Sequence, residues 1–146
     1  MRYKDTGNLH LDFHRTTNGT IAYLRKTYGE AFLDDIIRNT ARDVYKAIRD
    51  DLMAGNPEHL IEHWIYYLER EGGAFTVERR DDETRVDVTR CPAAATLKAH
   101  GIPLDSAFRH QTTVLNEALA EGTPFEIITE VFDDLHYVET VRRRRV

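Results

Sequence analysis

The chain has 146 residues, of which 41% are hydrophobic and 31% are charged, which predicts one folded domain over residues 1–146 and excludes a disordered chain. Its formal net charge of −5 argues against nucleic acid as a partner, because phosphate backbones bind basic surfaces. The one cysteine excludes an internal disulfide, and no apolar run suggests a membrane span or a signal peptide, so we expect a cytoplasmic protein without a membrane partner.

The N-terminal half has the residue spacing of helices. Residues 1–15 are polar at their start, and we expect them to form a loosely held lead-in. From Thr16 onward apolar side chains recur every three or four residues, which predicts a helix that Gly29 breaks or bends. The clearest helix follows over residues 32–52, with apolar side chains on one face and oppositely charged pairs on the other.

A second break separates this long helix from the next. The segment Gly55-Asn56-Pro57 ends the long helix, and Asn56 is a suitable N-cap for the helix that follows. That helix covers about residues 57–71 and has an apolar stripe. Gly72-Gly73 ends it, since glycine permits the backbone conformations that follow a helix.

The spacing of apolar residues then changes to the two-residue period of strands. Residues 75–80 and 84–89 alternate on either side of an Asp81-Asp82 turn, which predicts an antiparallel hairpin with one solvent-facing side. A second hairpin is predicted over residues 125–132 and 136–141, around another acidic turn.

Two helices are predicted between the hairpins, a short one from Cys91 to about His100 and a longer one over residues 103–121. The predicted fold class is therefore α+β, with a helical N-terminal half packed on a four-stranded antiparallel sheet made of the two hairpins. The helical pair lies between the hairpins in the chain, and the pattern leaves the strand order open.

The junction between the first hairpin and the short helix holds Cys91. Pro92 suits the first position of a helix, so Cys91 is expected at the N-cap, before free backbone N–H groups and the positive end of the helix dipole. Arg90 adds a nearby cation, and both effects favour the thiolate, which is the reactive form of cysteine. Cys91 is therefore the candidate nucleophile, and the alternative is a small buried apolar residue, as most free cysteines are.

His110 is the candidate proton carrier for Cys91. It lies in the second helix of the pair, and it faces Cys91 if the two helices fold back on each other. A cysteine with a nearby histidine is the smallest arrangement of a nucleophile and a base. The alternative is an ordinary histidine on a helix surface.

Polar and aromatic side chains supply candidate binding residues. Asp87 and Thr89 share one face of the first hairpin with Arg85. They are binding residues if this face lines a cavity, and ordinary exterior residues if it meets water. Trp64 and Tyr67 belong to an aromatic group that either walls an apolar pocket or forms part of the core or of a dimer contact.

Two further patterns have ordinary explanations. The segment His59-Leu60-Ile61-Glu62-His63 matches the H-x-x-E-H pattern of inverted zinc peptidases, in which two histidines four residues apart share one helix face. The pattern is short, so we expect a solvated helix edge, with no metal and no cofactor. The basic run Arg142–Arg145 is expected to be a solvated terminus.

Several short segments follow one another in a recognisable order. They are Tyr28-Gly29-Glu30-Ala31, Asp35-Ile36-Ile37, Val88-Thr89-Arg90-Cys91-Pro92, Gly101, Ala118-Leu119-Ala120-Glu121-Gly122 and Phe125-Glu126-Ile127. Over about residues 23–131 this order resembles the L-2-amino-thiazoline-4-carboxylic acid hydrolase family. The resemblance implies a hydrolase that opens a C–N bond of a small cyclic amidine or amide with water.

The resemblance also implies roles for particular residues. The family's first cysteine maps onto Cys91, whereas its two other cysteines fall near His110 and Thr113 and near Phe125, where this chain has none. We expect Cys91 to be the nucleophile, His110 to move the proton, and the backbone N–H groups after Cys91 to stabilise negative charge. The side chains expected to bind the substrate are Arg90, Thr89, Asp87, Thr113, Trp64 and Tyr67.

A different class of function fits the same pattern. A helical layer on a small antiparallel sheet also suits a non-catalytic domain that binds a small molecule or forms a dimer, because fold does not decide function. The apolar helices are compatible with a homodimer in either case.

Overall fold

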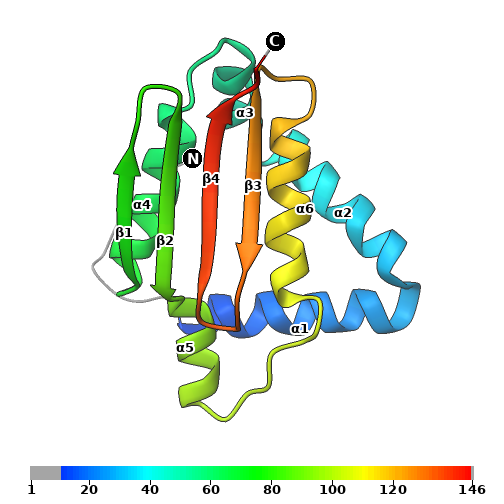
Figure 1. The fold of residues 1–146 in the computed structure, drawn as a ribbon. Coiled ribbons are helices and arrows are strands. Elements are labelled where there is room, and N and C mark those ends of the chain that lie inside the picture. Colours follow the sequence, from blue (N-terminus) through cyan, green and yellow to red (C-terminus); the bar gives the residue numbers. More distant parts are fainter. Residues whose placement is uncertain (1–10, 146) are drawn as a thin grey trace.

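The computed structural model describes residues 11–145 of the chain (Figure 1). The elements in order are α1 (Leu11–Tyr28), α2 (Glu30–Asp43), α3 (Lys46–Met53), α4 (Glu58–Arg70), β1 (Ala74–Arg79), β2 (Glu83–Arg90), α5 (Pro92–Ala99), α6 (Phe108–Ala120), β3 (Phe125–Val131) and β4 (Tyr137–Arg143). The predicted α+β class is confirmed. Of the helices described here, none combines the length and the apolar composition that crossing a membrane requires.

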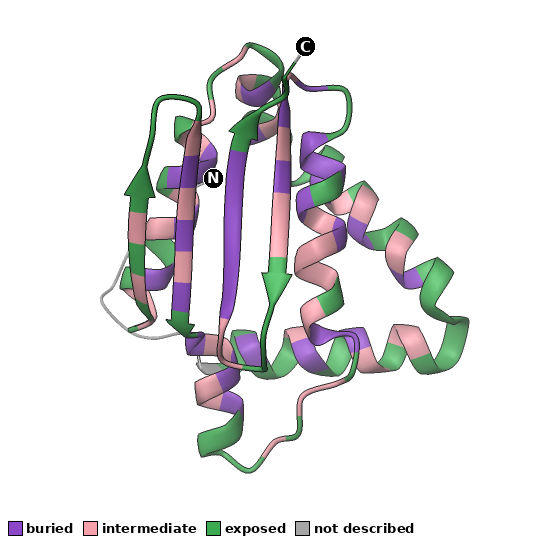
Figure 2. Ribbon diagram, in the orientation of Figure 1, coloured by how far each residue is buried: buried purple, intermediate pink, exposed green. Residues whose placement is uncertain are grey.

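The strands form one antiparallel sheet in the order β1-β2-β4-β3. The two predicted hairpins therefore join through β2 and β4, with Val86 opposite Glu139 at the centre of the sheet. In the second hairpin Ile127 lies opposite Val141. The helices cover one face of the sheet, and β4 is the most buried strand along its length (Figures 1 and 2). The face that the helices cover is called the inner face below.

The main core lies between the inner face of the sheet and helices α4 and α6. Alternate residues of each strand point into it, which is why β2 shows a strict alternation of buried and half-buried positions. The fully buried side chains of this layer include Leu60, Ile61, Val86, Val88 and Leu119. A second, smaller core joins α1, α2, α5 and α6 around Leu33 and Leu97.

Helix α1 begins earlier than predicted. Residues 11–15 belong to the helix and are not part of a loose lead-in, while residues 1–10 lie outside the described part of the chain. Tertiary contacts explain the difference, because His14 Nε2 lies 3.2 Å from Glu71 Oε2 at the end of α4. The predicted break at Gly29 is confirmed, and its φ of 90° is a conformation that glycine adopts at no steric cost.

The predicted single helix over residues 32–52 is in fact two helices, α2 and α3. The carbonyl of Thr40 accepts hydrogen bonds from the N–H groups of both Val44 and Tyr45, so the regular pattern ends there. The Thr40 hydroxyl also donates to the Ile36 carbonyl at 2.9 Å, a local bond that tends to bend helices. The apolar spacing continues across the break, which is why the sequence predicts one helix here instead of two.

Helix α6 begins at Phe108, five residues later than predicted. Residues 103–107 form a loop that contacts α1, where Asn18 donates to the Pro103 carbonyl and accepts from the Asp105 N–H. The Asp105 carboxylate accepts two hydrogen bonds from Arg25, at 2.8 and 2.7 Å. These long-range contacts satisfy polar groups of residues 103–107 in a loop conformation, so the helix begins only after them.

Candidate functional site

Cys91 occupies the predicted position at the start of α5. Its backbone is extended, with φ −64° and ψ 119°, and Pro92 follows at the first helical position. The Cys91 N–H donates to the Leu135 carbonyl at 2.8 Å, which ties the start of α5 to the turn between β3 and β4. The thiol makes no hydrogen bond to the helix end, and the residue is only 4% exposed within the main core.

A buried acid lies on the same inner face of the sheet. Glu139 of β4 is 4% exposed, and Asn116 of α6 is 2% exposed. The Asn116 side-chain amide donates to Glu139 Oε1 and to Thr129 Oγ1, both at 2.9 Å. Because an unpaired buried carboxyl group is costly, this amide is the contact that allows Glu139 to remain inside.

Burial controls the ionisation of this group. It raises the pKa of Glu139 to about 7, and the hydrogen bond from Asn116 and the charge of Arg109 offset part of that rise. Burial also raises the pKa of Tyr137, with smaller contributions from the charges of Glu139 and Cys91. The phenol therefore stays neutral, whereas Glu139 can gain and lose a proton near neutral pH.

Arg109 of α6 lies next to Tyr137 and the β3–β4 turn. Its guanidinium lies 4.7 Å from the centre of the Tyr137 ring and donates to the Asp134 carbonyl. We call the set Cys91, Arg109, Asn116, Tyr137 and Glu139 the inner-face cluster. Thr113 lies on α6 between Arg109 and Asn116, on the helix stripe that both share, and it is half-buried. The predicted binding residue Thr113 is thus placed next to this cluster.

His110 contacts a different part of the molecule. Its Nε2 lies 2.8 Å from Asp34 Oδ1 of α2, and the side chain is 46% exposed. Within the described residues, no hydrogen bond joins His110 to Cys91. The two helices of the pair do not bring this imidazole to the thiol, because α6 turns that edge toward α2.

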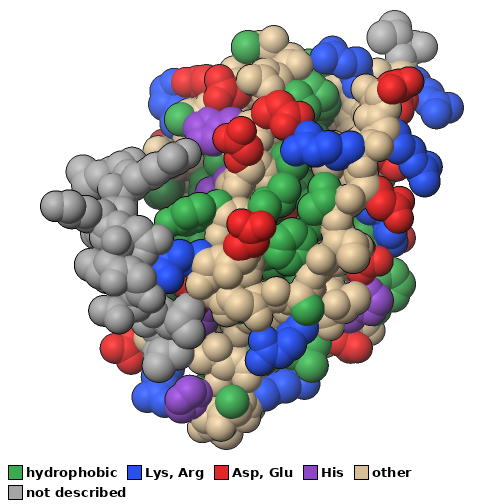
Figure 3. All heavy atoms as spheres, turned by 90° about the vertical axis from the view of Figure 1, so that its left-hand side faces the viewer, with side chains coloured by type: hydrophobic (Ala, Val, Ile, Leu, Met, Phe, Trp, Pro, Cys, Tyr) green, Lys and Arg blue, Asp and Glu red, His purple; other side chains and the backbone are tan. Residues whose placement is uncertain are grey.

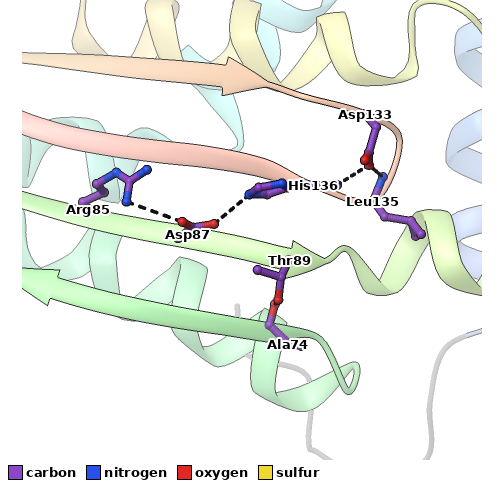
Figure 4. Close-up of polar contacts among 7 residues, drawn as sticks. All are labelled: Ala74, Arg85, Asp87, Thr89, Asp133, Leu135 and His136. Atoms are coloured by element: carbon purple, nitrogen blue, oxygen red, sulfur yellow. Dashed lines mark hydrogen bonds and ion pairs between the residues drawn. The ribbon is translucent and has the colours of Figure 1, made fainter.

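Arg85 and Asp87 of β2 point toward His136 (Figure 4), and they alternate with Val86 and Val88, which face the core that holds Cys91. Asp87 accepts a hydrogen bond from His136 Nε2 at 2.9 Å, and Arg85 lies 3.4 Å away on its other side. The Thr89 hydroxyl donates to the Ala74 carbonyl. Asp87 and Thr89 are therefore separated by the sheet from the thiol with which they were expected to form a substrate site.

The other predicted binding residues are dispersed. Arg90 is exposed and donates to the Gly72 carbonyl at 3.0 Å. Trp64 is 8% exposed and packs in the same core as Cys91, whereas Tyr67 is 52% exposed on α4. Of this aromatic pair, only Trp64 shares the environment of the thiol.

The two histidines of the H-x-x-E-H segment make separate contacts. His59 Nδ1 lies 2.7 Å from Asp51 Oδ2. His63 lies between the rings of Tyr45 and Tyr67, where burial lowers its pKa to about 4. Residues 11–145 contain no group of three or more His, Cys, Asp or Glu side chains arranged to hold a metal ion.

The sequence contains a signal that Glu139 faces the core, which the predictions above did not use. In the alternating segment of β4 the acid is in phase with Tyr137 and Val141, both of which face the core. An acid at an inward position of a buried strand requires a partner or a raised pKa. Asn116 and Arg109 carried no comparable signal, because their role depends on how α6 packs on β4.

A comparison with protein-family models finds no match for this chain, and neither does a comparison with curated proteins. The likeness to the thiazoline-carboxylate hydrolases therefore rests on the segments quoted above. The inner-face cluster is the part of the described structure that combines a thiol with a buried proton carrier.

Proposed function

We propose that the protein is a small-molecule hydrolase that opens a C–N bond of a small cyclic amidine or amide, with Cys91 as the nucleophile. One observation carries the proposal: the thiol at the start of α5 shares the inner face with Glu139, whose pKa is raised to about 7. Perturbed titratable groups in the same part of a fold as a nucleophile are typical of active sites. The family resemblance supplies the class of substrate.

The proposed reaction uses groups that the cluster provides. The Cys91 sulfur attacks the sp² carbon of the ring, the C–N bond breaks, and the thiol proton passes to the departing nitrogen. In this proposal Glu139 takes the place first assigned to His110 as the acid–base group, and the proton reaches it through bound substrate or water, because Glu139 lies four residues along the chain from Leu135, whose carbonyl accepts the Cys91 N–H. The backbone N–H groups of Ala93 and Ala94 stabilise the developing negative charge at the helix end. Water then cleaves the thioester or thioimidate and restores the thiol.

Substrate must reach a thiol that is closed off in this conformation. The turn between β3 and β4 lies next to it, because the Leu135 carbonyl accepts the Cys91 N–H and Leu135 packs against the core that holds Cys91. Asp134 of the same turn is held by Arg109 and by Lys98, whose Nζ lies 3.2 Å from the carboxylate. In our proposal this turn moves away to admit the substrate.

The closed thiol also favours a second candidate. Cys91 is 4% exposed and His110 is bonded to Asp34, which suits a non-catalytic binding or dimeric interaction domain. In that case the inner-face cluster is a buried polar network that fixes how α6 packs on the sheet.

Alkylation of the single cysteine separates the two candidates. We expect iodoacetamide to modify Cys91 in the native protein at pH 7, and Glu139→Gln to change the pH profile of this reaction without changing the rate in the unfolded chain. A thiol that reacts only after unfolding would exclude the hydrolase and support the binding domain. A reactive thiol would be followed by a screen of cyclic amidines and lactams, in which Cys91→Ala must abolish turnover.

A further inference from the structure

A second candidate site lies at the end of the sheet farthest from Cys91. A recess of about 590 Å³ is formed there by the β1–β2 turn, the start of β3 and the end of β4. Its lining residues are Arg80, Asp82, Glu83, Glu126, Arg142, Arg143, Arg144 and Arg145. We call it the arginine recess, and its basic side chains are visible at the upper right of Figure 3, with acidic ones among them.

The backbone that carries these arginines is held in place. The Arg143 N–H donates to the Asp82 carbonyl, and the Arg144 N–H donates to the Pro124 carbonyl, both at 2.9 Å. Arg142 and Arg143 are residues of β4 itself. The four side chains of Arg142–Arg145 are exposed, as predicted for a solvated terminus, but the backbone is hydrogen-bonded through Arg144 to the β1–β2 turn and to Pro124, and the side chains line the recess.

Several of these cations lack an acidic partner. Arg142 is paired with Glu126, but the Arg143 guanidinium lies over the Phe125 ring at 5.0 Å and donates to the Gly55 carbonyl. Among residues 11–145, no carboxylate forms an ion pair with Arg143, Arg144 or Arg145. The recess holds five arginines against three carboxylates, on a chain whose net charge is −5.

We propose that the arginine recess binds the phosphate group of a small organic molecule. The planar guanidinium donates paired hydrogen bonds that match the oxygens of phosphate, and several converging arginines favour a group with two negative charges. The volume falls in the range of small-ligand sites. Nucleic acid is disfavoured, because its backbone requires a basic stripe longer than one recess.

An adjoining hollow can take the organic part of the ligand. It measures about 310 Å³ and shares Arg80, Asp82, Glu83 and Arg143 with the arginine recess. Its lining adds Pro57, Thr84, Phe125 and Val141 together with three charged residues, Glu58, Arg79 and Asp81. A molecule with a phosphate group and a polar organic portion that accepts and donates hydrogen bonds would use both hollows at once.

This site is separate from the inner-face cluster. Tyr137 and Arg143 lie at the two ends of β4, and six residues of strand span about 20 Å. A test of phosphate binding at the arginine recess is therefore independent of the hydrolase proposal.

Calorimetric titration with pyrophosphate tests the proposal. We compare the wild-type chain, the double variant R144A/R145A, and the matched control R15A/K26A, which removes two exposed cations from α1 at the other end of the molecule (Figure 1). We expect saturable binding with one site per chain, a loss of at least tenfold in affinity for R144A/R145A, and less than a twofold change in the control. Circular dichroism confirms that the variants fold.

Three results would overturn the proposal. They are the absence of saturable binding to the wild-type chain, an equal loss of affinity in the control, and binding of a ten-nucleotide single strand where pyrophosphate fails. The second result would indicate that pyrophosphate binding depends only on the overall charge of the protein. The third would indicate that the recess is a nucleic-acid surface.

Discussion

The Asn116 amide donates a hydrogen bond of 2.9 Å to Glu139 Oε1, and both side chains are almost completely withdrawn from water. The pair joins the middle of α6 to the central strand β4. It also determines when Glu139 holds a proton, because the amide partly offsets the rise in pKa that burial causes. This one contact therefore contributes both to the packing of α6 on the sheet and to the chemistry proposed for the inner face.

Stability should fall as pH rises through the neutral range. The pKa of Glu139 is about 7 in the fold against an ordinary value of 4.5, so between these values the native state keeps a proton that the unfolded chain has lost. Raising the pH from 4.5 to above 7 should therefore cost about 3 kcal/mol from this group alone. Urea unfolding at a series of pH values measures the loss, and Glu139→Gln should remove it. An unchanged profile in the variant would show that another group is responsible.

Replacing Asn116 by leucine should both destabilise the protein and shift this pH range. The variant leaves Glu139 buried without its donor, which typically costs about 1–3 kcal/mol. In the wild type the hydrogen bond from Asn116 lowers the pKa of Glu139. Its loss should raise that pKa, so the fall in stability should move to higher pH. Thr129→Val serves as the control, since it removes only the second bond of the same amide. A shift as large in the control as in Asn116→Leu would contradict this account.

The elements of this fold could be predicted because each depends on local spacing. The alternation in β2 and the Cys91-Pro92 start of α5 are local signals, and the structure confirms both. The break between α2 and α3 was missed, because the apolar spacing runs through Val44 and Tyr45 while the hydrogen bonds do not.

The candidate site could be predicted only in part, because side-chain neighbours depend on tertiary packing. Cys91 was found from its position in the chain. Its expected partner His110 instead contacts Asp34, which lies 76 residues away in sequence. The groups that do share its face, Tyr137 and Glu139, belong to a strand that begins 46 residues after it, and only the pairing of β2 with β4 brings them together.

His63 should destabilise the fold under mildly acidic conditions. Its pKa is about 4 in the fold against an ordinary value of 6.5, so the unfolded chain binds the extra proton between these values. Stability should fall by up to about 3 kcal/mol as pH drops from 6.5 to 4, opposite in sign to the effect of Glu139. His63→Phe keeps an aromatic ring between Tyr45 and Tyr67 and should remove this contribution, so that the opposite effect of Glu139 is left and stability decreases more steeply from pH 4.5 to 6.5 than in the wild type. Urea midpoints at pH 4.5 and 6.5 are the measurement, and an unchanged difference between them in the variant would assign the fall to other groups.

Asp105 should account for part of the loss of stability in strong acid. The hydrogen bonds from Arg25 hold the pKa of this carboxyl at about 2, well below its ordinary 3.8. The native state therefore stays ionised where the unfolded chain is protonated, and stability is lost as pH falls from 3.8 to 2. We expect Asp105→Asn to cost about 1 kcal/mol at pH 7, because solvent near Arg25 screens part of the attraction.

The matched control for Asp105→Asn is Glu117→Gln, which removes the carboxylate of the exposed pair with Arg38 on α2 and should cost less than about 0.5 kcal/mol. The two pairs differ in burial, since the Asp105 side chain is 5% exposed and the Glu117 side chain is 54% exposed. Asp105 also accepts the Ala107 N–H and thereby shapes the loop that delays the start of α6. Equal costs for the two variants, measured by urea unfolding at pH 7, would show that the Arg25–Asp105 pair is only a surface contact and that other contacts hold the 103–107 loop on α1.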